Sequence, residues 1–136
     1  MVQRDMSAEP MVNREPAVEG FDGLLGLEVI ELSDERARGR VVVRGELTQG
    51  AGAVHGGVYA AVAESLATMA TLRSARAADV LAQQTSLVRA VKDGTIEAVA
   101  TRKHRGRTTW VWEVECADGG GQLCALTRVT LAIRQA

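Results

Sequence analysis

The feature that most constrains the fold is a long apolar run that begins at Gly57 and continues to about Ala75. The run lacks the alternation of a strand and is too long for one, so we expect a helix of about five turns. Apolar residues occur nearly all round this helix, which predicts that it is buried. One carboxylate, Glu64, interrupts it. Because an ionised, unpaired carboxylate costs several kcal/mol in apolar surroundings, packing alone does not explain Glu64.

Segments with strand character lie on both sides of this helix. They are residues 26–33 and 37–44 before it, and 80–90, 95–104, 108–117 and 122–134 after it. Residues 45–54 are rich in glycine and polar side chains and indicate a loop, and 21–27 could form a short turn or helical cap. The order is β-β-α-β-β-β-β. Only an antiparallel sheet is available to cover the helix, so we predict an α+β fold with the sheet wrapped around one central helix.

Length and charge predict one domain that binds neither nucleic acid nor a membrane. We expect residues 1–17, which hold both prolines, to be a flexible lead-in and 18–136 to form a single domain. A net charge of −1 gives no general attraction to polyanions. We find neither a span of about 18 uncharged apolar residues nor a secretory signal. The two cysteines, Cys116 and Cys124, have no metal-binding spacing, so we expect reduced packing residues, no metal and a cytoplasmic protein.

Residues that could carry chemistry gather at the start of the predicted helix. Gly56 and Gly57 would leave free backbone N–H groups at its positive end, where a developing oxyanion could be held. Glu64 could serve as a nucleophile or a general base, and the Thr68 hydroxyl, one turn further on, could orient a water. Alternative interpretations stay open: the glycines as a helix entry, His55 as a cap, Thr68 as a packing residue, and Glu64 in a salt bridge to Arg89 or another basic residue.

The spacing of these residues has a consequence for assembly. Eight residues separate Gly56 from Glu64, which is about 12 Å along a helix. One carbonyl carbon cannot lie about 3 Å from both. If both act on one substrate atom, they come from two subunits related by a two-fold axis. We therefore expect a dimer with an antiparallel helix pair and two composite sites.

The segment H-G-G-V-Y-A-A-V-A-E-S-L-A-T, residues 55–68, resembles the hotdog-fold acyl-CoA thioesterases. The resemblance is greatest to the Arthrobacter-type 4-hydroxybenzoyl-CoA thioesterases and covers most of residues 24–134. It extends to Gln49, to R-A-V-K-D-G at 89–94, to G-R-T-T-W-V-W-E-V at 106–114 and to G-Q-L-C-A-L at 121–126. The element order of the hotdog fold, a sheet wrapped around one long helix, is the order predicted from the residues.

This resemblance implies a role for each matched residue. Glu64 would be the catalytic carboxylate, and the Gly56 N–H of the neighbouring subunit would polarise the thioester carbonyl. Gln49 and His55 would support that loop and the carbonyl, and Thr68 would position the hydrolytic water.

Coenzyme A contacts and assembly are implied in the same way. Arg89 and Arg134 match positions expected to hold coenzyme A phosphates, and Thr108 falls in the nucleotide-binding turn. A serine is expected before T-T-W, where this chain has Arg107, one of four basic residues at 102–107 that could strengthen phosphate binding or form a solvated strand end. Coenzyme A would be part of the substrate, with no other cofactor, and dimers would pair into a homotetramer.

The substrate expected from the resemblance is an aromatic acyl-CoA such as 4-hydroxybenzoyl-CoA. Small residues near Glu64 (Ala60, Ala61 and Ala63) leave room for a flat ring or for a short branched chain. Phenylacetyl-CoA and short aliphatic acyl-CoA esters therefore stay open as alternatives. A non-catalytic hotdog domain that binds acyl-CoA is a third possibility, which the joint presence of Gln49, Gly56, Glu64 and Thr68 disfavours.

Overall fold

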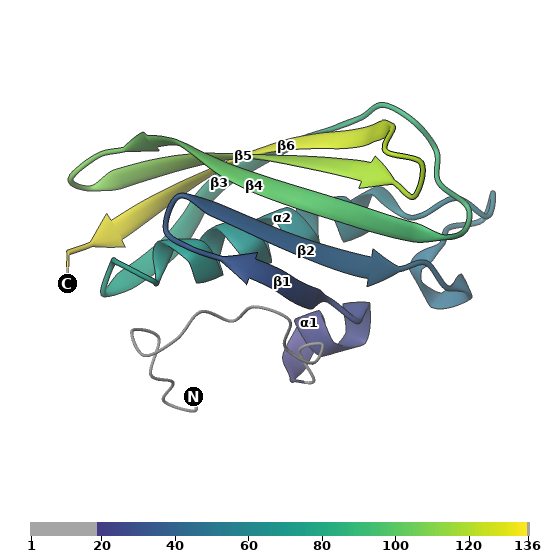
Figure 1. The fold of residues 1–136 in the computed structure, drawn as a ribbon, viewed down its shortest axis with the longest axis horizontal. Helices are drawn as coiled ribbons and strands as arrows, with labels where there is room; N and C mark the ends of the chain where they lie inside the picture. The colour runs from purple at the N-terminus through teal and green to yellow at the C-terminus, as the bar shows by residue number, and fades with distance from the viewer. Residues whose placement is uncertain (1–18, 136) are drawn as a thin grey trace.

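The computed structural model describes residues 19–135, and its strands form one antiparallel sheet that curves around a long helix (Figure 1). The predicted lead-in, residues 1–17, lies outside the described residues. The elements are α1 (Gly20–Leu25), β1 (Glu28–Leu32), β2 (Arg36–Val42), the 3₁₀ helix η1 (Gly45–Leu47), α2 (Gly56–Thr71), β3 (Ala77–Leu87), β4 (Thr95–Arg105), β5 (Thr109–Asp118) and β6 (Leu123–Arg134). The predicted α+β order is confirmed, with α1 and η1 added ahead of α2.

The strands lie in the order β1-β2-β4-β5-β6-β3, so that β1 and β3 form the two edges. β3 pairs with β6 from Ala77 opposite Arg134 to Leu87 opposite Ala125. Within residues 19–135, no strand pairs with the other side of β3. The sheet therefore has one long free edge of 11 residues, whereas the other edge strand, β1, has five.

The inner face of the sheet packs on α2 and forms the core. Trp110, Trp112 and Val114 occupy alternate positions of β5 and are buried, as their spacing predicts. The indole Nε1–H of Trp112 donates to the Thr71 hydroxyl at 2.9 Å, and this hydroxyl donates to the Ala67 carbonyl at 2.7 Å. These buried hydrogen bonds fix the C-terminal end of α2 against β5.

α2 ends at Thr71, earlier than the expected end near position 75. Beyond it the chain turns, and the N–H groups of Ser74 and Ala75 both donate to the Thr71 carbonyl, at 3.1 and 2.9 Å. The Ser74 hydroxyl donates to the Asp34 carboxylate in the turn between β1 and β2. β3 begins at position 77 rather than 80 because its first residues pair with the end of β6. Tertiary contacts thus set both boundaries.

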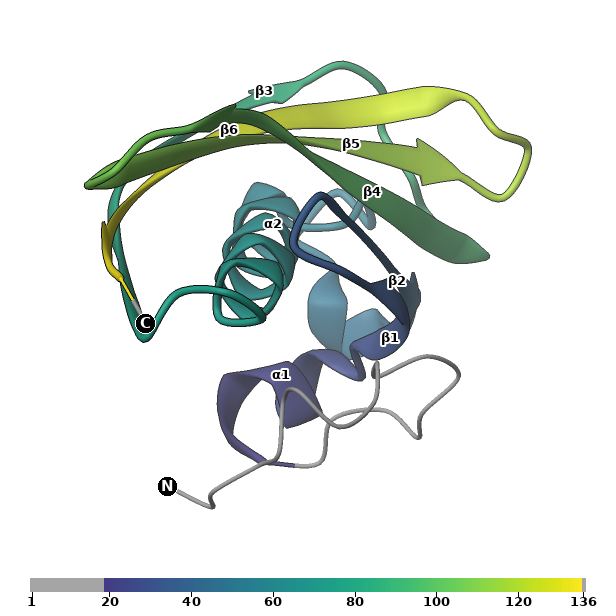
Figure 2. The same ribbon diagram turned by 60° about the vertical axis from the view of Figure 1, so that its left-hand side comes forward.

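The prediction that α2 is buried all round is wrong for one stripe. Gly57 is exposed, and Ala60, Ala61, Glu64 and Thr68 are only half-buried. In Figure 2 the sheet arches over one side of α2, and α1 lies on the side away from β4, β5 and β6. Of the helices within residues 19–135, none has the length and apolarity that a membrane span requires.

Candidate active site

Helix α2 begins at Gly56, with His55 as its N-cap residue. The Nδ1 atom of His55 accepts a hydrogen bond from the Gly57 N–H at 2.8 Å. A Cβ at position 57 would lie 3.0 Å from this Nδ1, so glycine lets the imidazole fold over the first turn. The structure therefore gives His55 the capping role that was one of its two interpretations.

The N–H of Gly56 is free, because it has no acceptor within residues 19–135. It belongs to the first turn of α2, where N–H groups lack partners inside the helix. A Cβ at this position would lie 2.9 Å from the Leu87 Cδ1 atom, so the end of β3 lies against the glycine. A free N–H at the positive end of a helix can stabilise a developing negative charge.

Gln49 lies in the loop that leads into α2. Its N–H donates to the Ala53 carbonyl at 2.9 Å, and its carbonyl accepts from the Gly52 N–H at 2.7 Å. Gly52 has a φ of 85°, which favours glycine. An isolated antiparallel β-bridge between Thr48 and Val54 closes this turn, and Val54 directly precedes His55. The structure therefore places the exposed Gln49 side chain at the same end of the molecule as the start of α2.

Glu64 lies in the middle of α2, half-buried on the stripe that the sheet leaves uncovered. Its carboxylate forms no ion pair or hydrogen bond within the described part of the chain. The alternative salt bridge to Arg89 is absent there, and Arg89 is exposed beyond the end of β3. Thr68 is half-buried on the same stripe, whereas Ala63, expected beside Glu64, is buried in the core.

The residues expected to hold coenzyme A lie at opposite ends of the sheet. Arg107 and Thr108 form the turn between β4 and β5, and Arg134 ends β6 beside it, where the Ile133 N–H donates to the Thr108 carbonyl at 3.0 Å. Arg89 follows the other end of β3, where its N–H donates to a β6 carbonyl at 3.2 Å. One chain therefore brings three of the four together and leaves Arg89 apart.

Three of the four basic residues at 102–107 have structural partners. The guanidinium groups of Arg102 and Arg105 lie 3.8 and 3.2 Å from the Asp34 carboxylate, and both stack at 4.9 Å on the Trp110 ring. The Lys103 ammonium lies 3.8 Å from a carboxylate of β5. The exposed Arg107 guanidinium has no partner within residues 19–135 and stays available for a phosphate.

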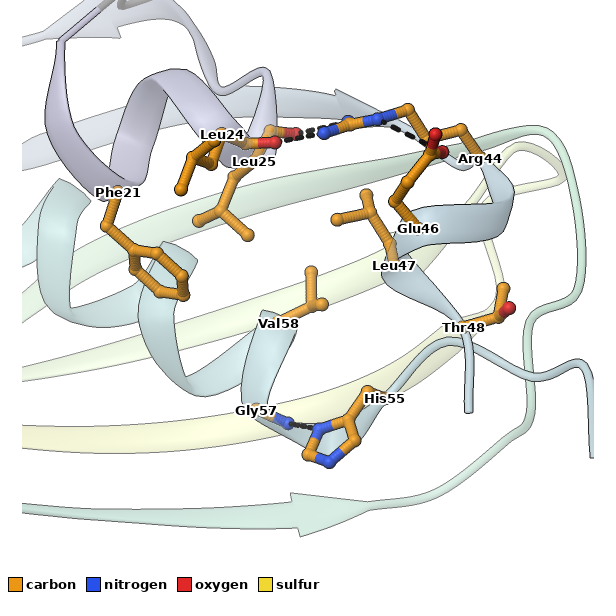
Figure 3. A pocket seen from close by; sticks show the side chains of 10 residues that line it. All are labelled: Phe21, Leu24, Leu25, Arg44, Glu46, Leu47, Thr48, His55, Gly57 and Val58. Carbon is orange, nitrogen blue, oxygen red and sulfur yellow. Dashed lines mark hydrogen bonds and ion pairs between the residues drawn. The ribbon is translucent and has the colours of Figure 1, made fainter. Parts of the chain in front are cut away.

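A cavity of about 520 Å³ lies beside the start of α2 (Figure 3). It is lined by residues of α1, of the segment around η1, and of the first turn of α2: Phe21, Leu24, Leu25, Arg44, Glu46, Leu47, Thr48, His55, Gly57 and Val58. Sequence patterns predicted no functional role for most of these residues. One signal that could have found them is the spacing of Phe21 and Leu24, two apolar residues three apart, in a segment that was interpreted only as a turn or helical cap.

The two cysteines of the chain lie in the core and not at the candidate site. Cys116 and Cys124 are free and buried, as predicted. Burial raises the pKa of Cys116 to about 12, with a smaller contribution from the neighbouring Cys124. Burial also raises the pKa of Cys124, so both thiols stay protonated packing residues at neutral pH.

Comparison with known proteins gives the family. A model of the thioesterase superfamily matches residues 51–125. The Mycobacterium tuberculosis protein Rv1847, named as an esterase, is 36% identical over 117 residues, 82% of this chain and 84% of that protein. Its solved structure matches with a TM-score of 0.82 at 35% identity and covers 85% of this chain and 97% of that chain.

Two further relatives have names that specify a reaction. The proofreading thioesterase EntH of Cronobacter turicensis is 32% identical over 112 residues, 80% of this chain and 82% of that protein. The 1,4-dihydroxy-2-naphthoyl-CoA hydrolase of Listeria monocytogenes is 25% identical over 119 residues, 85% of this chain and 97% of that protein. Because the family model matches more than half of its residues and its architecture is shared with a solved relative, the chain belongs to the thioesterase superfamily, has the hotdog fold and is a thioester hydrolase.

Proposed function

We propose that the protein hydrolyses acyl-CoA thioesters to a free acid and coenzyme A, like the Arthrobacter-type 4-hydroxybenzoyl-CoA thioesterases that it resembles. One observation carries this proposal: α2 holds both a free N–H at Gly56 and a carboxylate at Glu64 that has no partner within residues 19–135. Neither group contributes a hydrogen bond to the described fold, so both are available to a substrate.

Two routes fit these groups. In the nucleophilic route, a Glu64 oxygen attacks the thioester carbonyl carbon, the C–S bond breaks, coenzyme A leaves as the thiolate, and water hydrolyses the anhydride. In the general-base route, Glu64 takes a proton from a water that attacks the same carbon, and Thr68 helps to hold that water. The C–S bond then breaks, and the departing thiolate of coenzyme A takes the proton from Glu64. Both routes place negative charge on the carbonyl oxygen, which the partner subunit's Gly56 N–H stabilises.

The free edge of β3 supports the two-fold dimer that this chemistry requires. Residues 81–84 and 86–90 are exposed, and Leu81 and Leu87 are 63% and 59% exposed. Antiparallel pairing of β3 with its copy would satisfy the unpaired backbone groups and bury these leucines. It would also set the uncovered stripes of two α2 helices side by side, running in opposite directions.

The same axis accounts for the separated coenzyme A residues. Because β3 runs from the Arg134 end of the sheet to the Arg89 end, antiparallel pairing brings the partner subunit's Arg89 toward Arg107, Thr108 and Arg134. The cations at these positions suit phosphate groups. We propose that each coenzyme A is held by both subunits, and that dimers pair into a tetramer.

An aromatic acyl group such as 4-hydroxybenzoyl is our first proposal for the acid. The resemblance favours it, and the name of the Listeria relative specifies an aromatic acyl-CoA. Phenylacetyl-CoA and short aliphatic esters are the alternatives, and comparison of kcat/KM across a panel of CoA esters decides among them.

The first experiment measures thiol release by Glu64→Gln. We expect kcat to fall by about 10²–10⁴ if Glu64 is a general base, and further if it is the nucleophile. Glu97→Gln is the matched control, because Glu97 is also half-buried and lies in β4 away from α2. Unchanged hydrolysis by the Glu64 variant would refute the assignment. Stoichiometric acyl-CoA binding by the wild type, with no thiol released, would establish the non-catalytic alternative.

A second experiment tests the composite site with Gly56→Pro. Proline is tolerated at the first position of a helix and lacks the N–H. Its Cβ would also lie 2.9 Å from the Leu87 Cδ1 atom, so Gly56→Ala, which adds the same Cβ and keeps the N–H, is the matched control. His55, with φ −64° and ψ 136°, already has the extended backbone that a following proline requires. We expect a loss of about 10²–10³ in kcat.

Mixing two inactive variants then shows whether each active site is formed by one subunit or by two. When Gly56→Pro and Glu64→Gln subunits are unfolded together and refolded, each mixed dimer regains one intact site if the site is shared. No recovery of activity would mean that each site lies within one chain.

A further inference from the structure

The cavity beside α2 has a roof made by α1, which sequence patterns did not assign. Phe21 and Leu24 are 62% and 68% exposed, and Figure 3 shows the Phe21 ring directed from α1 toward α2. The buried side chains of Leu25, Leu47 and Val58 complete its apolar wall. Large exposed apolar side chains gathered over one hollow are typical of a surface that binds an apolar group.

The cavity lies next to the group that we propose to polarise the thioester. Its lining includes His55 and Gly57, the two residues on either side of Gly56. A carbonyl oxygen bound at the Gly56 N–H would therefore have the cavity next to its carbon substituent. Of the substituents of a thioester carbonyl, sulfur leads to coenzyme A and carbon leads to the acyl group.

The size and polarity of the cavity limit that acyl group. A cavity of about 150 Å³ holds a benzene ring, and this one has about 520 Å³. Its one cation, Arg44, is already engaged: it donates to the Leu24 and Leu25 carbonyls, at 3.1 Å to the latter, and lies 3.6 Å from the Glu46 carboxylate. The exposed Glu46 would repel an anionic acyl end.

We propose that this cavity binds the acyl group and selects uncharged, apolar acyl groups larger than a benzoyl ring, so that 4-hydroxybenzoyl-CoA, which the resemblance favours, is accepted but is not the best substrate. The proposal rests on the proposed function, and it makes α1 the element that determines which acyl groups the enzyme accepts. A fused aromatic ring and a medium-length alkyl chain share the required chemistry, and a substrate panel separates them. Acyl groups that end in a carboxylate, such as succinyl, are excluded.

The test measures kcat/KM for acetyl-, benzoyl-, succinyl-, 2-naphthoyl- and octanoyl-CoA. We expect one or both of the last two to exceed benzoyl-CoA by about tenfold or more, and their order shows whether the cavity prefers a flat ring or a chain. Leu24→Gln places an amide in the apolar wall, and Phe21→Ala removes part of the roof. Each should lower kcat/KM for the larger esters about tenfold and change that for acetyl-CoA less than twofold.

Val42→Gln is the matched control for Leu24→Gln, because Val42 is 61% exposed and does not line the cavity. Its activity should match the wild type for every ester. If the wild type releases thiol but the α1 variants change kcat/KM equally for acetyl- and 2-naphthoyl-CoA, or change it for neither, the proposal is overturned. If the wild type released no thiol from any ester, the proposed function itself would fail. Thermal unfolding of each variant shows whether it is folded.

Discussion

Replacement of Thr71 by valine should destabilise the protein through a single buried hydrogen bond. Thr71 and Trp112 are both fully buried, and the indole N–H has the Thr71 hydroxyl as its acceptor at 2.9 Å. Valine has nearly the same shape, so the substitution leaves no large cavity and strands the indole N–H. A buried donor without an acceptor costs about 1–3 kcal/mol. The Ala67 carbonyl loses only an additional donor, since it also accepts within the helix.

Urea unfolding followed by circular dichroism measures this change, with the m-value as a check on two-state behaviour. We expect Thr71→Val to lower the free energy of unfolding by about 2 kcal/mol. Thr71→Ser keeps the hydroxyl and loses a methyl group, which costs about 1 kcal/mol. If the valine variant is as stable as the wild type, or more stable than the serine variant, the hydrogen bond does not anchor α2.

Two further predictions concern other parts of the core. Gly39→Ala should lower the free energy of unfolding by about 1–3 kcal/mol. The added Cβ would lie 3.1 Å from the side chains of both Leu27 and Leu66 and 3.2 Å from a backbone oxygen. A decrease of less than about 0.5 kcal/mol in urea unfolding would contradict this packing. Burial raises the Cys116 pKa from 9.0 to about 12, so above pH 9 the unfolded thiol loses its proton first. The free energy of unfolding should therefore decrease as the pH rises from about 9 toward 12, and Cys116→Ala should weaken that pH dependence in urea unfolding.

The sequence was sufficient to predict the central helix and the strands around it. A run of apolar residues this long fits only a helix, and the alternation of Trp110, Trp112 and Val114 fits only a half-buried strand. These two inferences rest on local pattern, which the tertiary structure did not override. Glu64 was identified because a carboxylate is costly on a buried helix, but within the single chain it is half-buried on the stripe that the sheet leaves uncovered.

Features that depend on tertiary structure were not predicted. Apolar residues show which faces of a helix can be buried, but not which faces the sheet actually covers. The sequence therefore did not reveal that the sheet leaves one stripe of α2, including Glu64, uncovered. α1 has only six residues, two of them glycines, and arginine contacts to its last carbonyls help to hold it. The separation of Arg89 from Arg134 follows from strand order, which residue spacing does not give.

The open side of β3 also has a consequence for how this chain folds. An isolated subunit presents 11 residues of strand, with exposed Leu81 and Leu87, to any other strand that it meets. Such an edge is a template for aggregation until a proper partner covers it. As long as monomers persist during refolding, this edge should therefore cause more aggregation than the stability of the chain alone would suggest, and Leu81→Lys should reduce both aggregation and assembly.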